Sequence, residues 1–212
     1  MSKFIKNFKK SYQDSKWAGG ELVDDVMHQV SEDIVSFLND YDIIHDNIKV
    51  FEIGSGGCRN LRHIYNSNNN VELYANDLYK DASFKNMHED IKRVINFLEI
   101  DTLKLMKEMN YNDIDLFMSS YHLMHIDSDS CKEIVDRLTD VWKPKHIFLN
   151  ELIMQKFPGH YPDREIPRIF HDFSKLEESY ELIGDRISIR DTLEPAVKGY
   201  YNFRLYKSRI LE

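Results

Sequence analysis

Residues 48–60 read IKVFEIGSGGCRN, an apolar run that contains Glu52 and leads at once into the turn Gly54-Ser55-Gly56-Gly57. Glycines allow a tight turn and let a ligand approach the backbone closely. The start of the helix that follows offers unpaired N–H groups. The stretch therefore predicts a strand, a ligand-binding turn and a helix.

Five short apolar runs alternate with helical or turn segments. Such alternation is typical of parallel strands joined by right-handed crossovers. A helix precedes the first run, because apolar residues recur every four positions between residues 21 and 38. Residues 201–206 alternate apolar and polar side chains, and residues 182–189 offer an antiparallel partner. We therefore expect an α/β fold whose doubly wound sheet includes residues 48–53, 71–75, 95–100, 114–118 and 147–149.

The position of the third strand in this scheme is less direct than the capping signal of a later helix. Residues 91–98 could continue a helix from Met87, but we favour a strand over 95–100, because the sheet would otherwise lack one strand. This strand ends next to Asp101, and Asp90 is the alternative if the strand lies earlier. Ser130 and Glu133 have the spacing of a capping box, which predicts that a helix begins at Ser130.

The composition limits the classes of protein to consider. A chain of 212 residues with 42% hydrophobic residues fits one globular domain, residues 1–212. A net charge of -8 disfavours nucleic acid as a partner. Cys58 and Cys131 can form neither a disulfide framework nor a paired metal-ligand motif, so we expect no metal site and a cytoplasmic location.

Membrane association is also disfavoured by the sequence. No apolar stretch approaches the roughly 20 residues that span a bilayer, so we expect no membrane span. Residues 3–12, KFIKNFKKSY, form a basic amphipathic pattern. We interpret this pattern as a short helix that packs on the fold, with binding to a membrane surface as the alternative.

Polar residues stand at the ends of successive predicted strands. They are Glu52 before the glycine turn, Asp77, Asp101, and the pair Ser119 and Ser120. In open α/β sheets a ligand binds outside the carboxyl ends of the strands. We therefore expect these positions to face one crevice.

Two nucleotide-binding templates do not fit the glycine turn. A dinucleotide fingerprint that begins at Gly54 requires glycine at position 59, which is Arg59. A Walker phosphate loop requires Lys followed by Ser or Thr, and neither pair follows these glycines. In addition, a carboxylate at position 52 would repel a pyrophosphate but could hold an ammonium group or hydroxyls.

With these motifs, residues 45–206 resemble the class I S-adenosylmethionine-dependent methyltransferases. That family has an acid before a glycine-rich turn and a second acid at the end of the next strand. The resemblance implies a Rossmann-like, seven-stranded sheet of order 3-2-1-4-5-7-6 with its last strand antiparallel. It also implies S-adenosylmethionine as cofactor, S-adenosylhomocysteine as product, and a cofactor-binding core over residues 45–152. Residues 1–44 would then supply N-terminal helices and a lid, and residues 153–212 an acceptor-binding insertion and a C-terminal hairpin.

The resemblance also implies roles for individual residues. Gly54 and Gly56 would approach the cofactor, Glu52 would help to orient it, Asp77 would take the ribose hydroxyls, and Asp101 would lie near the adenine amino group. Asp77 and Asp101 could instead merely cap the helices that follow them. The cofactor site in this interpretation also includes Ser55, Leu78, Thr102 and Ser119.

The chain departs from the family pattern at two places. The third glycine of the family motif falls on Cys58, which we interpret as a small packing residue. The usual Lys-Pro-Gly-Gly before the fifth strand is Lys143-Pro144-Lys145-His146. Neither departure falls on an acid of the predicted cofactor site.

Candidate catalytic and substrate-binding residues follow the fourth and fifth strands. His122 and Glu151 are the candidate bases, whereas His125 lies among packing residues. His160, Tyr161, Arg164 and Arg168 could bind the methyl acceptor, or the arginines could pair with neighbouring acids in a solvated loop.

We expect methyl transfer to an O or N atom of a small molecule. The chain lacks the Asp/Asn-Pro-Pro-Tyr tetrapeptide and the Pro-Cys nucleophile of enzymes that methylate nucleic-acid bases. The alternative is a catalytically silent module that binds S-adenosylmethionine and acts in regulation or through a partner. The sequence predicts no oligomeric state.

Overall fold

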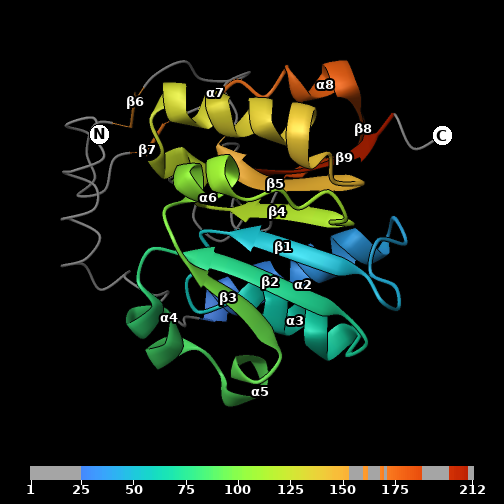
Figure 1. Cartoon of the computed structure of the whole chain (residues 1–212). Helices are drawn as coiled ribbons and strands as arrows, with labels where there is room; N and C mark the ends of the chain where they lie inside the picture. Colours follow the sequence, from blue (N-terminus) through green and yellow to red (C-terminus); the bar gives the residue numbers. More distant parts are fainter. Residues whose placement is uncertain (1–24, 153–159, 162–167, 170, 188–200, 210–212) are drawn as a thin grey trace.

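The structure is a computed structural model that describes residues 25–152, 160–161, 168–169, 171–187 and 201–209 (Figure 1). Its main sheet contains β1 (Lys49–Ile53), β2 (Glu72–Asp77), β3 (Ile95–Glu99), β4 (Leu116–Ser120), β5 (His146–Leu152), β8 (Tyr180–Ile187) and β9 (Tyr201–Ser208). The strand order is β3-β2-β1-β4-β5-β9-β8. The first five strands are parallel, and β9 runs antiparallel to both β5 and β8. The sheet order that the resemblance implied, 3-2-1-4-5-7-6, is therefore confirmed.

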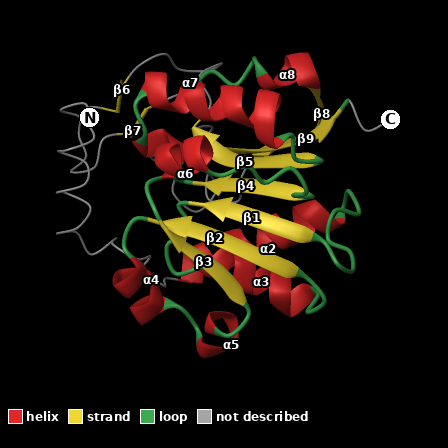
Figure 2. Cartoon of the chain, in the orientation of Figure 1, coloured by secondary structure: helices red, strands yellow, loops and turns green. Residues whose placement is uncertain are grey.

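Helices cover both faces of this sheet (Figures 1 and 2). The helices α2 (Asp25–Asn39) and α3 (Arg59–Ser67) pack on one face, and α6 (Thr102–Glu108) and α7 (Ser128–Arg137) pack on the other. Val50 and Phe51, neighbours in β1, lie in the two different cores. Because both faces are buried, the strands appear in the sequence as nearly continuous apolar runs.

Shorter elements complete the described chain. They are α4 (Lys80–Asn86), α5 (Glu89–Lys92), η2 (Leu123–His125), η3 (Leu138–Trp142), α8 (Leu176–Ser179) and a separate two-stranded sheet of β6 (His160–Tyr161) and β7 (Arg168–Ile169). The carboxyl ends of β1, β2 and β4 point to the same side of the molecule (Figure 1).

The predicted third strand is confirmed, but one predicted helix start is wrong. The helix α5 ends at Lys92 and β3 begins at Ile95, so Asp101 rather than Asp90 follows the strand. The helix α7 begins at Ser128, two residues before the predicted Ser130. Its N-cap is Asp127, whose side chain accepts from the N–H and from the hydroxyl of Ser130. The amphipathic pattern at 3–12 and the start of the first predicted helix lie outside the described residues.

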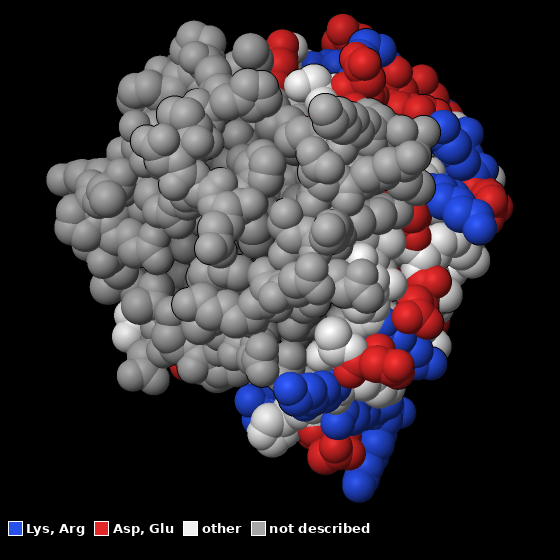
Figure 3. Space-filling view, turned by 90° about the vertical axis from the view of Figure 1, so that its left-hand side faces the viewer, with Lys and Arg blue, Asp and Glu red and all other residues white. Residues whose placement is uncertain are grey.

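The described surface carries charges of both signs. On the face in Figure 3, Lys and Arg side chains lie beside Asp and Glu side chains along the described margin. Within the described ranges, no helix is long and apolar enough to cross a membrane.

Candidate active site

The glycine turn between β1 and α3 has the conformation that its sequence predicts. Gly54 and Gly56 have φ values of 60° and 52°, in the left-handed region that favours glycine. Cys58 also has a positive φ of 57°. It occupies the position at which the methyltransferase motif has its third glycine, so the backbone there keeps the glycine conformation although the residue differs. The N–H of Ser55 donates to the carbonyl of Asn76, which ties the turn to the end of β2.

Asp77, the last residue of β2, is bonded directly to this turn. Its Oδ2 accepts from the N–H of Gly56 at 2.9 Å, and its Oδ1 accepts from the N–H of Leu78 at 2.6 Å. The side chain is buried, and this burial raises the pKa of Asp77 while the backbone N–H bonds oppose the shift. Asp77 at the end of β2 therefore holds the turn that follows β1.

Glu52 lies under the turn with one oxygen bonded and one unpaired. Its Oε1 accepts from Nδ2 of Asn60 at 2.6 Å, whereas the buried Oε2 has no hydrogen-bond partner among the residues that the structure describes. Burial raises the pKa of Glu52 to about 7, and the Asn60 bond and Arg59 oppose the shift. A buried carboxylate oxygen without a donor is costly, and a cationic donor would satisfy it. This residue fits the ammonium group of S-adenosylmethionine.

Replacing Glu52 by glutamine is expected to stabilise the protein at alkaline pH. The folded-state pKa of about 7 lies above the ordinary 4.5, so the native carboxyl loses stability as the pH rises through this range. Glutamine does not ionise, and its advantage should grow by roughly 2 kcal/mol between pH 5 and pH 8. Urea denaturation at both pH values measures this difference. Glu89→Gln, at an exposed ion pair with Lys92, is the control, and an equal gain in both variants would contradict the prediction.

The ends of β2, β3 and β4 are joined by a chain of hydrogen bonds. Nδ2 of Asn76 donates to the carbonyl of Ile100, which turns its Oδ1 towards the hydroxyl of Thr102 at 2.9 Å. The same hydroxyl lies 2.9 Å from Nε2 of His122. Since the one proton of Thr102 goes to Asn76, Nε2 of His122 carries a proton and Nδ1 keeps a lone pair. Asp101 caps α6 by accepting from the N–H of Lys104, which is the structural role considered from the sequence.

The imidazole of His122 lies directly against Gly54. A Cβ placed on Gly54 would be 2.1 Å from Cγ and Nδ1 of His122, far inside any normal contact. Burial lowers the pKa of His122 to about 4, with Asp101 opposing, so the ring is neutral at pH 7. His122 thus fills the space above a glycine that the resemblance assigns to the cofactor, and a ligand in contact with Gly54 there requires the ring to move.

Gly54→Ala is expected to destabilise the protein by about 2 kcal/mol, because alanine disfavours a positive φ and its Cβ would overlap His122. The double variant with His122→Ala separates the two causes, since it removes the overlap and keeps the backbone strain. Thermal unfolding of the single and double variants measures both contributions. Unchanged stability in Gly54→Ala would contradict this packing.

Ser119 and Glu151 are bonded to each other on the next strands. The hydroxyl of Ser119 donates to Oε1 of Glu151 at 2.6 Å. The same carboxylate accepts from the backbone N–H groups of His122, Leu123 and Met124 at 2.9 to 3.2 Å. Glu151 is completely buried, and this burial raises its pKa. Both candidate catalytic residues are thus brought together at the end of β4, although Glu151 holds backbone there.

Three of the four predicted acceptor-binding residues lie in the small sheet of β6 and β7, and β7 lies beside η2, the segment that follows His122. His160 and Tyr161 form β6, and Tyr161 pairs with Arg168 of β7. Arg164 lies outside the described residues. Within the part of the chain that the structure describes, no three His, Cys, Asp or Glu side chains are grouped to hold a metal ion.

Many solved structures with the same architecture are methyltransferases, and the [4+2]-cyclase SpnF also shares it, with a TM-score of 0.60 at 13% identity, over 84% of this chain and 80% of SpnF. The mitomycin 7-O-methyltransferase MmcR has a TM-score of 0.67 at 11% identity, over 98% of this chain and 61% of its own. A second is the Haemonchus contortus phosphoethanolamine N-methyltransferase 1 in complex with phosphoethanolamine and S-adenosylhomocysteine. It has a TM-score of 0.65 at 16% identity, and the match covers 96% of this chain and 48% of that enzyme. A third is the magnesium protoporphyrin IX methyltransferase from Synechocystis PCC 6803 with bound S-adenosylmethionine. It has a TM-score of 0.60 at 11% identity, and the match covers 98% of this chain and 92% of that enzyme.

The chain has the class I methyltransferase fold. It spans about half to three fifths of the length of two of these enzymes. No protein-family model and no curated protein matches the sequence. At identities of 10% to 16% the likeness establishes this fold, and the activity is argued from the site itself.

Two polar residues of the site in this methyltransferase fold were missed from the sequence. Asn60 of α3 bonds Glu52, and Asn76 of β2 joins the turn to Thr102. Asn76 immediately precedes Asp77 at a strand end, so its position was a usable signal. Asn60 lies on the helix after the turn, where the sequence gives no comparable signal.

Proposed function

We propose that the protein is an S-adenosylmethionine-dependent methyltransferase that acts on an O or N atom of a small molecule. The observation that carries this proposal is the buried Glu52, whose unpartnered Oε2 lies beside a glycine turn that Asp77 fixes through the N–H of Gly56. The negative net charge of the chain supports a small acceptor over a nucleic acid. The enzymes of the same fold, named above, act on small molecules according to their names.

The residues at the strand ends would bind the parts of this cofactor separately. Oε2 of Glu52 would accept from the ammonium group. A carboxylate has about four lone-pair sites, so Asp77 can accept from ribose hydroxyls besides its backbone N–H bonds. Asp101, Leu78, Thr102 and Ser55 would lie around the adenosine.

The bound cofactor supplies an electrophilic methyl group, and the protein aligns the acceptor with it. Alignment of this kind can contribute roughly 7 to 11 kcal/mol to lowering the barrier. His122 would take a proton from the acceptor through Nδ1. This nitrogen has a lone pair, and the imidazole ring is neutral at pH 7. Glu151 holds the backbone of this segment, so we assign it to positioning His122 rather than to proton transfer.

A catalytically silent module that binds S-adenosylmethionine is the second candidate. The burial of His122 favours it, because burial lowers the pKa of the ring to about 4 and makes it a weak base for the acceptor. Both candidates predict binding, and only the first predicts transfer.

Thermal unfolding with S-adenosylmethionine and with S-adenosylhomocysteine tests both candidates at once. Saturating ligand is expected to raise the melting temperature. Incubation with a labelled methyl donor and metabolite extracts then tests transfer, with Asp77→Ala as the non-binding control. No shift with either ligand would contradict both candidates, whereas a shift without any transfer would favour the silent module.

A further inference from the structure

A line of hydrogen bonds runs from α2 through α3 to Glu52. Nε of Arg59 donates to the hydroxyl oxygen of Ser31 at 3.3 Å. The hydroxyl of Ser31 donates to Oδ1 of Asn60 at 2.7 Å, and Nδ2 of Asn60 donates to Oε1 of Glu52 at 2.6 Å. Ser31 is completely buried in α2.

The hydrogen bonds in this line run in one direction in the structure. The hydroxyl of Ser31 accepts from Arg59 and donates its proton to Asn60. A proton directed at Oδ1 sets the orientation of the Asn60 amide, and its nitrogen must then face Glu52. In this arrangement Asn60 presents a donor to Oε1.

This arrangement decides which oxygen of Glu52 meets a ligand. Because Oε1 is committed to accepting from Asn60, any proton on the carboxyl must lie on Oε2. Oε2 is buried and unpartnered, so it is either a charge without a donor or a donor without an acceptor. A ligand that brings a donor, preferably a cationic one, would satisfy its ionised form.

We propose that Asn60, oriented by Ser31, is a positioning residue that presents Oε2 of Glu52 to the ammonium group of S-adenosylmethionine. The proposal rests on the proposed function of the site. It also couples cofactor binding to the packing of α2, because Ser31 belongs to that helix.

The charged and titratable groups near Glu52 support a neutral-pH titration of this carboxyl. Arg59 of α3 favours its ionised form, whereas Asp77 of β2 disfavours it. Cys58 stays protonated, since burial raises the pKa of its thiol. Loss of the Asn60 donor should therefore raise the pKa of Glu52 and move the acidic loss of ligand affinity to higher pH.

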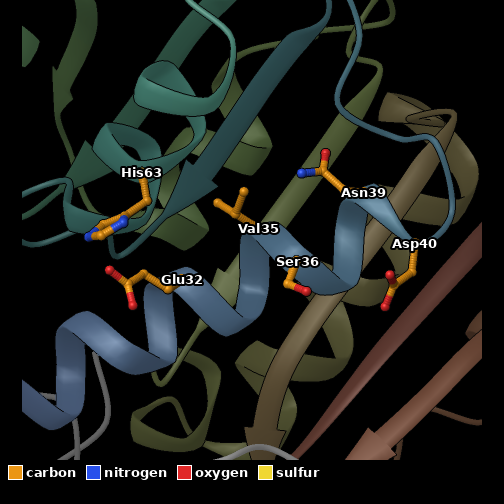
Figure 4. A pocket seen from close by; sticks show the side chains of 6 residues that line it. All are labelled: Glu32, Val35, Ser36, Asn39, Asp40 and His63. Atoms are coloured by element: carbon orange, nitrogen blue, oxygen red, sulfur yellow. The ribbon is translucent and has the colours of Figure 1, made fainter.

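A second polar contact joins the same two helices without touching Glu52. Nδ1 of His28 lies 3.2 Å from Nε2 of His63, and His63 faces Glu32 across a groove of about 400 Å³ (Figure 4). The groove is lined by Glu32, Val35, Ser36, Asn39, Asp40 and His63. His63→Gln is therefore a matched control for a disturbance of the α2–α3 interface.

Calorimetry with S-adenosylhomocysteine between pH 6 and pH 8.5 tests the proposal on the full chain. At pH 7.5, Asn60→Leu should weaken binding at least about tenfold, and Ser31→Ala should weaken it about threefold. The conservative variant Ser31→Thr and the control His63→Gln should each weaken it less than about twofold. In a Glu52→Gln background, Asn60→Leu should add less than about twofold. Ser31→Ala and Ser31→Thr carry the test if Asn60→Leu fails to fold.

The outcomes distinguish the positioning role of Ser31 and Asn60 from the proposed function of the site. Equal losses for Asn60→Leu in the wild-type and Glu52→Gln backgrounds, or for Ser31→Ala and His63→Gln, would overturn the positioning role. If the wild type binds no S-adenosylhomocysteine, the proposed function and the ammonium ligand are both wrong. A carboxyl-carbon NMR titration without ligand then still tests the hydrogen bond from Asn60 to Glu52. This bond requires the pKa of Glu52 to be higher in Asn60→Leu than in the wild type.

Discussion

Replacing Asp77 by alanine is expected to weaken the binding of S-adenosylhomocysteine at least about a hundredfold, since each hydrogen bond to a carboxylate contributes roughly 1.5 to 3 kcal/mol. The variant loses the acceptors for ribose hydroxyls and also frees the N–H groups of Gly56 and Leu78. The turn would no longer be fixed against β2. Calorimetry measures the affinity, and thermal unfolding reports the accompanying loss of stability.

Two comparisons separate ribose binding from a general loosening of the turn. Asp81→Ala, at an exposed position in the first turn of α4, is the control and should bind as the wild type does. An analogue without ribose hydroxyls should bind the wild type weakly and lose little further affinity in Asp77→Ala. If Asp77→Ala binds with wild-type affinity, Asp77 does not contact the ligand. If it loses affinity equally for S-adenosylhomocysteine and for the analogue, Asp77 only holds the turn.

The architecture could be predicted because each central strand is buried on both faces. Val50 and Phe51 point to different cores, so both had to be apolar, and the run was visible without knowledge of the fold. The edge strand β3 was harder to predict. Its side chains are only partly buried, and its apolar spacing also suits a helix. Pairing with β2 decides the conformation, and such pairing is not a local property of the sequence.

Helix caps show a second limit of local patterns. Both Asp127 and Ser130 are residues that cap helices, and Ser130 also has a glutamate at the capping-box spacing. In the structure Asp127 takes the cap, and it accepts from both the N–H and the hydroxyl of Ser130. When two residues that can cap a helix lie three positions apart, the backbone conformation decides which of them is the N-cap.

The acids of the candidate site were accessible from the sequence, whereas their partners were not. Glu52 and Asp77 stand at strand ends, and parallel strands bring such ends to one edge. Whether Asn60 reaches Glu52 depends on the rotation of α3 after the turn, and Ser31 enters from a helix that precedes the sheet. The contact of His122 with Gly54 depends equally on the conformation after β4.

That conformation depends on Glu151, and Glu151→Ala is expected to lower the free energy of unfolding by about 3 to 5 kcal/mol. The variant would leave a cavity and four donors without their acceptor: the hydroxyl of Ser119 and the N–H groups of His122, Leu123 and Met124. For a chain of this size the melting temperature should fall by roughly 10 °C or more. Thermal and urea unfolding measure the loss.

Glu151→Gln distinguishes this positioning role from that of a general base. Glutamine keeps an oxygen for Ser119, His122 and Leu123, but it turns an amide nitrogen towards the N–H of Met124, so about 1 to 2 kcal/mol of stability should be lost. Since the amide still holds the His122 backbone, most methyl transfer should remain. A stable Glu151→Gln variant that binds S-adenosylhomocysteine normally but transfers no methyl group would instead identify Glu151 as the base, because only its proton-accepting capacity would then have been removed.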